Sequence, residues 1–124
     1  MEDLKQTVVV LGASPKPERY SNKAVSLLKT HGHKVIPVHP AIKEIVGLPV
    51  AASLADIDMS VDTLTLYVSS IHSTPLIDTI LSLNPTRVIF NPGTENPTLS
   101  AALKEQGIHA EDACTLILLN TGQF

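Results

Sequence analysis

The stretch VVVLGASPKPERYS, from Val8 to Ser21, runs an apolar segment directly into a loop that contains one glycine, two prolines and two cations. With the preceding Thr7 the apolar part reads TVVVL, which predicts a strand covered on both faces. Such strands are typical of parallel sheets with helices above and below. The junction therefore predicts the start of an α/β domain, in which a strand leads through a short loop into a helix.

Apolar clusters rich in β-branched residues recur along the chain, with amphipathic segments between them. The strands that these clusters predict are Thr7–Leu11, Lys34–Val38, Val61–Val68, Arg87–Phe90 and Ile108–Ala110. Alternating strands and helices with right-handed crossovers predict a single-domain, Rossmann-like three-layer α/β sandwich. We expect its five-stranded sheet to be mostly parallel, with the strand order 3-2-1-4-5.

Capping residues and prolines mark the helices between these strands. The predicted helices run from Ser21, as the capping residue, to Lys29, from Thr74 to the residue before Pro85, and from Asn96 to Gly107. The segment from His39 to Ile57 breaks the alternation. It is interpreted as a loop with a helical turn at Ile42–Val46 and a short extended piece after it.

Length and composition narrow the classes of protein. The 124 residues fit one domain over residues 1–124, and the 44% apolar content with only 3% aromatic residues predicts a core of Val, Leu, Ile and Ala. The formal net charge is -3, and no basic patch is visible. Nucleic-acid binding is therefore not expected, because it requires a cationic surface and commonly uses stacking rings.

Cysteine usage and the N-terminal stretch bear on the cellular setting. The single Cys114 excludes an internal disulfide and a multi-cysteine zinc site, so a cytoplasmic location is the simplest expectation. The chain starts Met-Glu-Asp-Leu-Lys, without the features of a signal peptide. No apolar run approaches the roughly 20 residues that span a bilayer, so no membrane partner is expected.

The loop after the first predicted strand has properties that favour an anion. Gly12 lets the backbone turn, and Ala13 and Ser14 are small enough for a phosphate to approach main-chain N–H groups at the start of a helix. Lys16 and Arg19 add positive charge. The Gly-x-Gly-x-x-Gly fingerprint of dinucleotide sites is absent, and so is a P-loop, which disfavours NAD binding and ATP hydrolysis.

Three stretches carry a resemblance to a known family. They are VVVLGASPKPERYSNKAVSLLKTHGHKVIPVHP, EIVGLPVAASLADI and RVIFNPGTENPTLSAALKEQGIHAEDAC. Together they resemble the small stand-alone CoA-binding domain proteins, which are similar to the CoA-binding domain of the succinyl-CoA ligase alpha subunit. The resemblance covers nearly the whole chain and implies a small-molecule nucleotide-thiol ligand, coenzyme A or an acyl-CoA.

The resemblance also implies which residues meet the ligand. In chain order they are Gly12, Ala13, Ser14, Pro15, Lys16, Arg19, Val38, His39, Pro40, Tyr67, Val68, Ser69, Asn91, Pro92 and Gly93. The first five would face the phosphates, the middle residues would lie beside the nucleotide, and the last three would meet pantetheine. Relatives commonly have Pro-Val-Asn-Pro-Lys where this chain has Pro-Val-His-Pro followed by Ala41, and Trp and Gln where it has Phe90 and Asn91.

The sequence offers no convincing catalytic set. His39 is interpreted as a turn residue in preference to a catalytic base. Cys114 is interpreted as a buried small residue in preference to a nucleophile. The other histidines, His31, His33, His72 and His109, have no metal-site spacing supported by carboxylates. Glu111 and Asp112 are neighbours after the fifth predicted strand and would point to opposite faces, so they do not form an acid–base pair.

Three hypotheses of function remain open. The first is non-catalytic binding of coenzyme A or an acyl-CoA at the carboxyl ends of the strands. The chain ends at Phe124, before the phosphorylated-histidine domain of the large ligases, so we expect no acyl-CoA synthesis by this chain alone. The second is a small NAD(P)-dependent oxidoreductase, or another nucleotide-using enzyme, with His39 or Cys114 in the chemistry. The third is a scaffold or interaction protein with a vestigial cleft. A homodimer or a protein partner is also left open.

Overall fold

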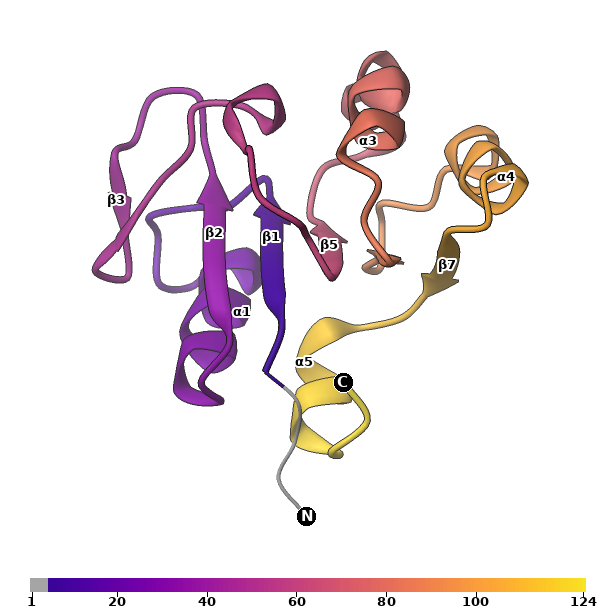
Figure 1. The fold of residues 1–124 in the computed structure, drawn as a ribbon. Coiled ribbons are helices and arrows are strands. Elements are labelled where there is room, and N and C mark those ends of the chain that lie inside the picture. Colours follow the sequence, from indigo (N-terminus) through magenta and orange to yellow (C-terminus); the bar gives the residue numbers. More distant parts are fainter. Residues whose placement is uncertain (1–4) are drawn as a thin grey trace.

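Five parallel strands form the central sheet of the computed structural model, which describes residues 5–124 (Figure 1). They are β1 (Thr7–Leu11), β2 (Lys34–Val38), β5 (Thr63–Leu66), β6 (Arg87–Phe90) and β7 (His109–Asp112). The strands pair in register, so that Val9 lies opposite Ile36 on one side and Leu64 on the other. The predicted α/β class with a parallel five-stranded sheet is confirmed. Of the N-terminal stretch used to judge export, residues 1–4 lie outside the described residues.

The order of the strands differs from the prediction. The sheet runs β2-β1-β5-β6-β7, which is 2-1-3-4-5 when its strands are numbered along the chain, so the predicted order 3-2-1-4-5 is wrong. Pro37 of β2 supplies a reason. Its carbonyl faces away from β1 and accepts from the N–H of Ala51. A full strand on that side would also need an N–H from residue 37, and proline has none. β2 is therefore an edge strand, and β5, buried along its whole length, takes the central place.

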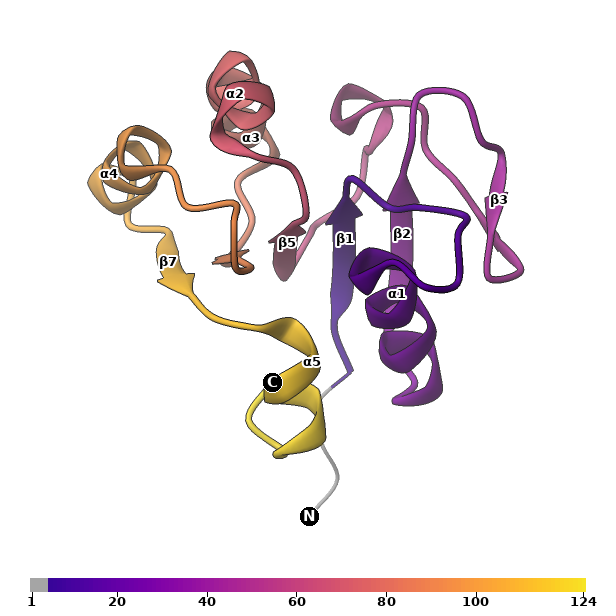
Figure 2. The same ribbon diagram turned by 180° about the vertical axis from the view of Figure 1, so that it is seen from behind.

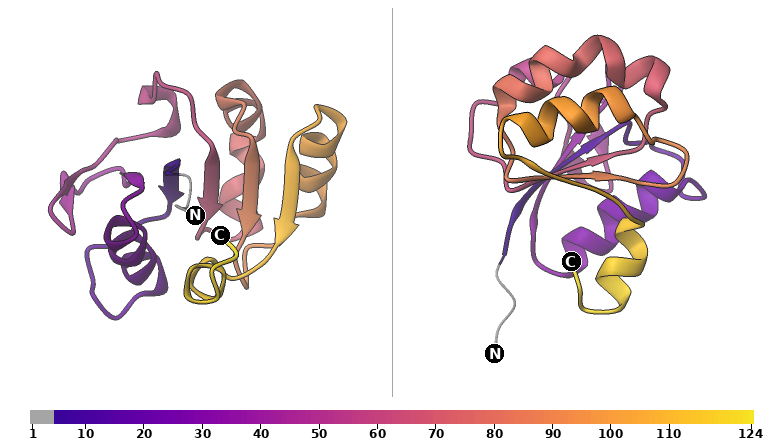
Figure 3. Two further views of the ribbon diagram at one scale, coloured as in Figure 1. Left: turned by 60° about the horizontal axis from the view of Figure 1, so that its bottom comes forward. Right: turned by 90° about the vertical axis from the view of Figure 1, so that its right-hand side faces the viewer.

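Helices cover both faces of the sheet. α1 (Tyr20–Thr30) and α5 (Thr115–Asn120) lie on one face, and α2 (Ser70–Ser73), α3 (Ile77–Leu83) and α4 (Pro97–Glu105) lie on the other (Figures 2 and 3). The short 3-10 helix η2 (Thr74–Leu76) joins α2 to α3. The predicted helix at Thr74 therefore begins four residues earlier, at Ser70.

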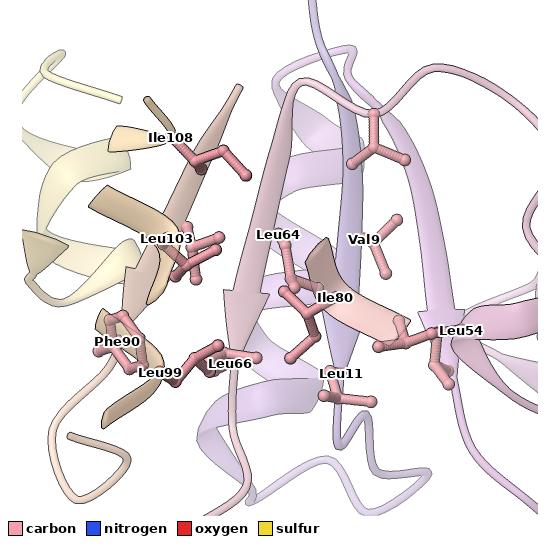
Figure 4. Packing of buried hydrophobic residues seen from close by; sticks show 13 residues of the cluster. Val9, Leu11, Leu54, Leu64, Leu66, Ile80, Phe90, Leu99, Leu103 and Ile108 are labelled. Carbon is pink, nitrogen blue, oxygen red and sulfur yellow. The ribbon is translucent and has the colours of Figure 1, made fainter. Parts of the chain in front are cut away.

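The side chains of β1 divide between two hydrophobic clusters. Val8 and Val10 pack with residues of α1 and α5. Val9 and Leu11 pack with residues of α3 and α4, in the cluster that Figure 4 shows. Because neighbouring strand residues point to opposite faces, the continuous apolar run TVVVL follows directly from this double coverage.

Two helix ends follow the local signals, one departs from its signal, and one helix was not predicted. The side chain of Asn96 accepts from the N–H of Leu99 at 3.1 Å and caps α4, as predicted. Asn84, in the left-handed region with φ 51°, ends α3 before Pro85. Ser21, however, does not cap α1, which already begins at Tyr20 with Arg19 in the capping position. The helix α5 was not predicted.

The segment after β2 folds into a hairpin rather than a helical turn. The antiparallel strands β3 (Glu44–Ile45) and β4 (Leu48–Pro49) pair with each other, so the helical turn predicted at Ile42–Val46 is wrong. Val46 and Gly47 between them both have positive φ, 53° and 72°, which is the backbone of a tight hairpin turn. The 3-10 helix η1 (Leu54–Asp56) follows.

Arg87 links several elements at the amino end of the sheet. Its guanidinium donates to the hydroxyl of Thr63 at 3.0 and 3.1 Å, lies 3.6 Å from Glu111, and stacks over the ring of Phe124 with 4.5 Å to the centroid. Burial lowers the pKa of Arg87, and the carboxylate of Glu111 opposes this effect. Arg87 and Glu111 therefore stabilise the packing at the amino ends of the strands, away from their carboxyl ends.

Within residues 5–124, no helix has the length and apolar character needed to cross a bilayer.

Candidate functional site

A cavity of about 750 Å³ opens at the carboxyl ends of β1, β2 and β5. Its walls come from the loops that follow these strands, and η1 and η2 contribute further side chains. β1 is the point from which the chain extends the sheet in both directions, and open α/β sheets bind ligands at such a switch point. The volume lies in the range of small-molecule sites.

The structure brings most of the expected site residues together around this cavity. Those that line it are Gly12, Ala13, Ser14, Pro15, Lys16, Arg19, Val38, His39, Pro40, Tyr67 and Val68. Ser69, Asn91, Pro92 and Gly93 are not among its lining residues. The first three loops of the predicted site therefore converge, and the loop after β6 does not contribute to the lining of this cavity.

Several lining residues were missed in the sequence. They are Leu11, Tyr20, Ser21, Ile42, Ala52, Ser53, Leu54 and Leu76. Half of them belong to the segment after β2, whose hairpin and 3-10 helix could not be placed without the tertiary structure. Ser21 carried a visible signal, a small polar residue at a helix start, which was interpreted as a helix cap.

Gly12 is required by the packing of two strand ends. Its φ is +89°, and a Cβ on it would lie 2.7 Å from Cγ1 of Val68 and 3.0 Å from the backbone of Tyr67. The N–H of Tyr67 donates to the carbonyl of Leu11 at 2.8 Å, which holds the two chains together at this point. The glycine thus lets the ends of β1 and β5 approach each other, and together they form one wall of the cavity.

The loop amides are less available to a ligand than the sequence suggests. The N–H of Ala13 donates to the carbonyl of Val38 at 3.3 Å, and the N–H of Lys16 donates to the hydroxyl of Ser14 at 3.1 Å. Pro15 has no N–H. Between Ala13 and Lys16, only the amide of Ser14 lacks a partner in residues 5–124. Most of the loop N–H groups that were expected to bind an anion therefore donate hydrogen bonds within the protein.

His39 organises the loop after β2. Its Nδ1 accepts from the N–H groups of Ala41 and Ile42, each at 3.0 Å, and its own N–H donates to the carbonyl of Ala51 at 3.1 Å. A nitrogen that accepts two hydrogen bonds carries no proton, so the neutral ring has its proton on Nε2. The imidazole does here what an asparagine side chain does in an Asx turn.

The charge of the cavity wall has one sign. Lys16 and Arg19 are exposed at its rim, and neither forms an ion pair within the described part of the chain. No aspartate or glutamate is among the lining residues. The electrostatic potential of this wall favours an anionic group over a cation.

Tyr67 combines a cavity wall with a buried hydroxyl. Its Oη is inaccessible to solvent and has no hydrogen-bond partner among residues 5–124. Burial raises the pKa of Tyr67 to about 12; the nearby Thr115 hydroxyl opposes this effect without forming a hydrogen bond of ordinary geometry, and the Cys114 thiol adds to it. The phenol therefore stays neutral at physiological pH and is no candidate for a general base.

Asn91 has a structural role at the end of β6. Its side-chain nitrogen donates to the hydroxyl of Thr65 at 2.6 Å and to the carbonyl of Leu66 at 2.8 Å. Its oxygen accepts from the N–H of Thr115 at 2.9 Å, and the hydroxyls of Thr65 and Thr115 lie 2.8 Å apart. With both N–H groups and the oxygen of its side chain engaged, and only 2% exposed, Asn91 joins α5 to the sheet. No group of three or more potential metal ligands occurs within residues 5–124.

Comparisons with known proteins support a single family. The family described as CoA binding domain matches residues 6–120. A Bacillus subtilis (strain 168) protein, the uncharacterized protein YneT, is 27% identical over 81% of this chain and 74% of its own. A solved structure of an uncharacterized protein is 39% identical, covers 98% of this chain and 100% of its own, and superposes with a TM-score of 0.87. Another, from Thermus thermophilus, is 31% identical over 97% of this chain and 91% of its own, with a TM-score of 0.88.

Proposed function

The chain belongs to the CoA binding domain family, and from this premise we propose that its cavity binds coenzyme A or an acyl-CoA without catalysing a reaction. The observation that carries the proposal is the coincidence of three features at one place. The 750 Å³ cavity lies at the switch point of the sheet, its rim bears Lys16 and Arg19, and its lining contains no carboxylate. A large, polyanionic, partly apolar ligand matches this combination.

The two kinds of wall suit the two kinds of group in the ligand. The phosphates lie towards Lys16 and Arg19, where positive charge compensates them. The adenine and the aliphatic part of pantetheine lie against the apolar side chains that the cavity gathers from Ile42, Leu54 and Leu76. No nucleophile and base lie within hydrogen-bond distance of each other at this cavity among the described residues, so binding is the function that the geometry supports best.

Calorimetric titration with coenzyme A, dephospho-coenzyme A and NADP tests the proposal. Tighter binding of coenzyme A than of dephospho-coenzyme A is expected, because the 3′-phosphate adds a further charge contact. Tighter binding of NADP would contradict the proposal in favour of the nucleotide-using enzyme, and failure of all three to bind would favour the scaffold. Mass spectrometry of the natively purified protein identifies any ligand that it retains.

Lys16→Ala is expected to weaken the binding of coenzyme A several-fold and to reduce its salt dependence, because one cation–phosphate contact is lost. Lys104→Ala is the matched control, since Lys104 is an exposed lysine on α4, away from the cavity lining. Equal affinities and equal salt dependences of the two variants would remove Lys16 from the site.

A further inference from the structure

Ser21 is a buried residue whose hydroxyl the fold does not use. The residue is only 5% exposed, yet its side chain has no hydrogen-bond partner in the described chain. The only side-chain oxygen or nitrogen in residues 5–124 that is both sealed from solvent and unpaired belongs to Tyr67. The Ser21 hydroxyl therefore keeps contact with open space, and Ser21 is a lining residue of the cavity. Buried polar groups in native proteins nearly always have a partner, so an unpaired one beside a cavity points to a ligand.

The surroundings of Ser21 are suited to an anion. Ser21 is the second residue of α1, an eleven-residue helix whose capping position, Arg19, provides no side-chain hydrogen bond. The first intrahelical bond in this turn is the one from the N–H of Lys23 to the carbonyl of Arg19. The N–H groups of Tyr20, Ser21 and Asn22 thus have no acceptor within the helix, and the positive end of the helix dipole lies beside the hydroxyl.

Asn22 fixes the facing loop against this helix end. Its side-chain nitrogen donates to the carbonyl of Ser14 at 2.8 Å, and Asn22 itself is 9% exposed. The hydroxyl of Ser14 accepts from the N–H of Lys16 and keeps its own proton for a further acceptor. Two serine hydroxyls, the free amides of α1 and the charges of Lys16 and Arg19 therefore border the same cavity.

We propose that Ser21 and the first turn of α1 hold a phosphate group of the ligand. The anion subsite then lies at the start of the helix, between the side chains of Ser14, Lys16 and Arg19, whereas the amides of Ala13 and Lys16 hold the loop itself. The Ser21 hydroxyl donates to a phosphate oxygen, and the N–H groups of the first turn donate to the same group. The inference rests on the proposed function for the identity of the ligand, but not for the chemistry of the subsite.

Ser21→Ala removes only the hydroxyl, and Ser26→Ala, an exposed serine on the same helix, is its matched control. Calorimetry is carried out with three probes: coenzyme A, inorganic pyrophosphate and pantetheine, which has no phosphate. Ser21→Ala is expected to lower the affinity for coenzyme A and for pyrophosphate about tenfold, which is the usual effect of losing one hydrogen bond to a charged group. The affinity for pantetheine is expected to stay unchanged. Ser26→Ala is expected to leave all three unchanged.

Thermal unfolding separates ligand binding from a structural role. The Ser21 hydroxyl has no intramolecular partner, so Ser21→Ala is expected to unfold at the same temperature as the unmodified protein without ligand, while losing affinity. A lower unfolding temperature with unchanged pyrophosphate affinity would overturn the inference. Binding of pyrophosphate that depends on Ser21, without any binding of coenzyme A, would overturn the proposed function and leave the anion subsite standing. Equal binding of coenzyme A by both serine variants would do the reverse.

Discussion

At position 12 the backbone conformation and the packing both require glycine. A positive φ disfavours any side chain, and the nearby Val68 leaves no space for a Cβ. The sequence shows the glycine, but the close contact with β5 becomes visible only in the fold. Tyr67, on the other side of the same contact, buries a hydroxyl that nothing satisfies. These two residues show that the wall of the cavity is closely packed where β1 and β5 end.

Gly12→Ala is expected to lower the free energy of unfolding by about 2 kcal/mol or more, because backbone strain and a steric clash add. Gly93→Ala separates the backbone strain from the steric clash. Gly93 has nearly the same φ, +90°, but a Cβ there meets no atom within 4 Å, so only the strain of about 1 kcal/mol is expected. Urea unfolding of both variants measures the difference. Equal losses would show that Val68 and Tyr67 move aside without cost.

Tyr67 makes stability depend on alkaline pH. The folded protein keeps the phenol neutral up to a pKa of about 12, whereas an unfolded tyrosine ionises near 10. The unfolded state thus releases its proton first, and the free energy of unfolding is expected to fall as pH rises from about 10 to about 12, by roughly 2 kcal/mol.

Tyr67→Phe is expected to abolish this part of the pH dependence and to leave stability at neutral pH unchanged or higher, because the lost hydroxyl has no partner. The chain has two tyrosines, so in Tyr20→Phe the absorbance of the phenolate reports Tyr67 alone. Ionisation of that single tyrosine near pH 10 in the folded protein would contradict the expectation.

Among the elements, those with local signals were predicted best. β1, β2 and β6 have the predicted bounds, since each is a short apolar run flanked by loop residues. The hairpin of β3 and β4 was missed because its turn places Val46, a β-branched residue, in the left-handed region that such residues rarely adopt. The turn held by His39 belongs to this same segment and positions the side chains that reach the cavity.

His39→Ala is expected to lower the free energy of unfolding by about 1–2 kcal/mol, because the N–H groups of Ala41 and Ile42 lose their shared acceptor. His39→Asn supplies a side-chain oxygen for the same two donors and is expected to restore most of the loss. Chemical unfolding of the three proteins measures both effects. If His39→Asn were as unstable as His39→Ala, the ring would stabilise the loop by its packing and not by accepting the two hydrogen bonds.

At the scale of the whole molecule, the sheet is joined to the helix α5 through buried polar contacts as well as through the apolar core. Asn91, Thr65 and Thr115 form a closed set of hydrogen bonds between the central strands and the start of α5. The resemblance places Asn91 at the ligand, whereas the structure engages its side chain fully inside the protein. Its replacement therefore affects the fold before it affects the site.

Asn91→Ala is expected to lower the free energy of unfolding by about 2–4 kcal/mol, because it leaves buried partners without hydrogen bonds. Asn120→Ala, an exposed asparagine on α5, serves as the control and is expected to change it by less than about 0.5 kcal/mol. Affinity for coenzyme A of the folded Asn91→Ala protein is expected to match that of the unmodified protein. A specific loss of affinity without loss of stability would place Asn91 at the ligand instead.

The sequence by itself determined the bounds of β1, β2 and β6, the cap of α4, the end of α3 and the loop after β1 that borders the cavity, because these depend on residues a few positions apart. Tertiary structure alone decided the strand order, the commitment of the Ala13 and Lys16 amides and the unpaired hydroxyl of Ser21. Each of these depends on contacts between distant parts of the chain, such as Ala13 with Val38 and Asn22 with Ser14. Pro37 is visible in the sequence, but the predicted strand order did not take its missing N–H into account, and the outward direction of its carbonyl appears only in the folded sheet.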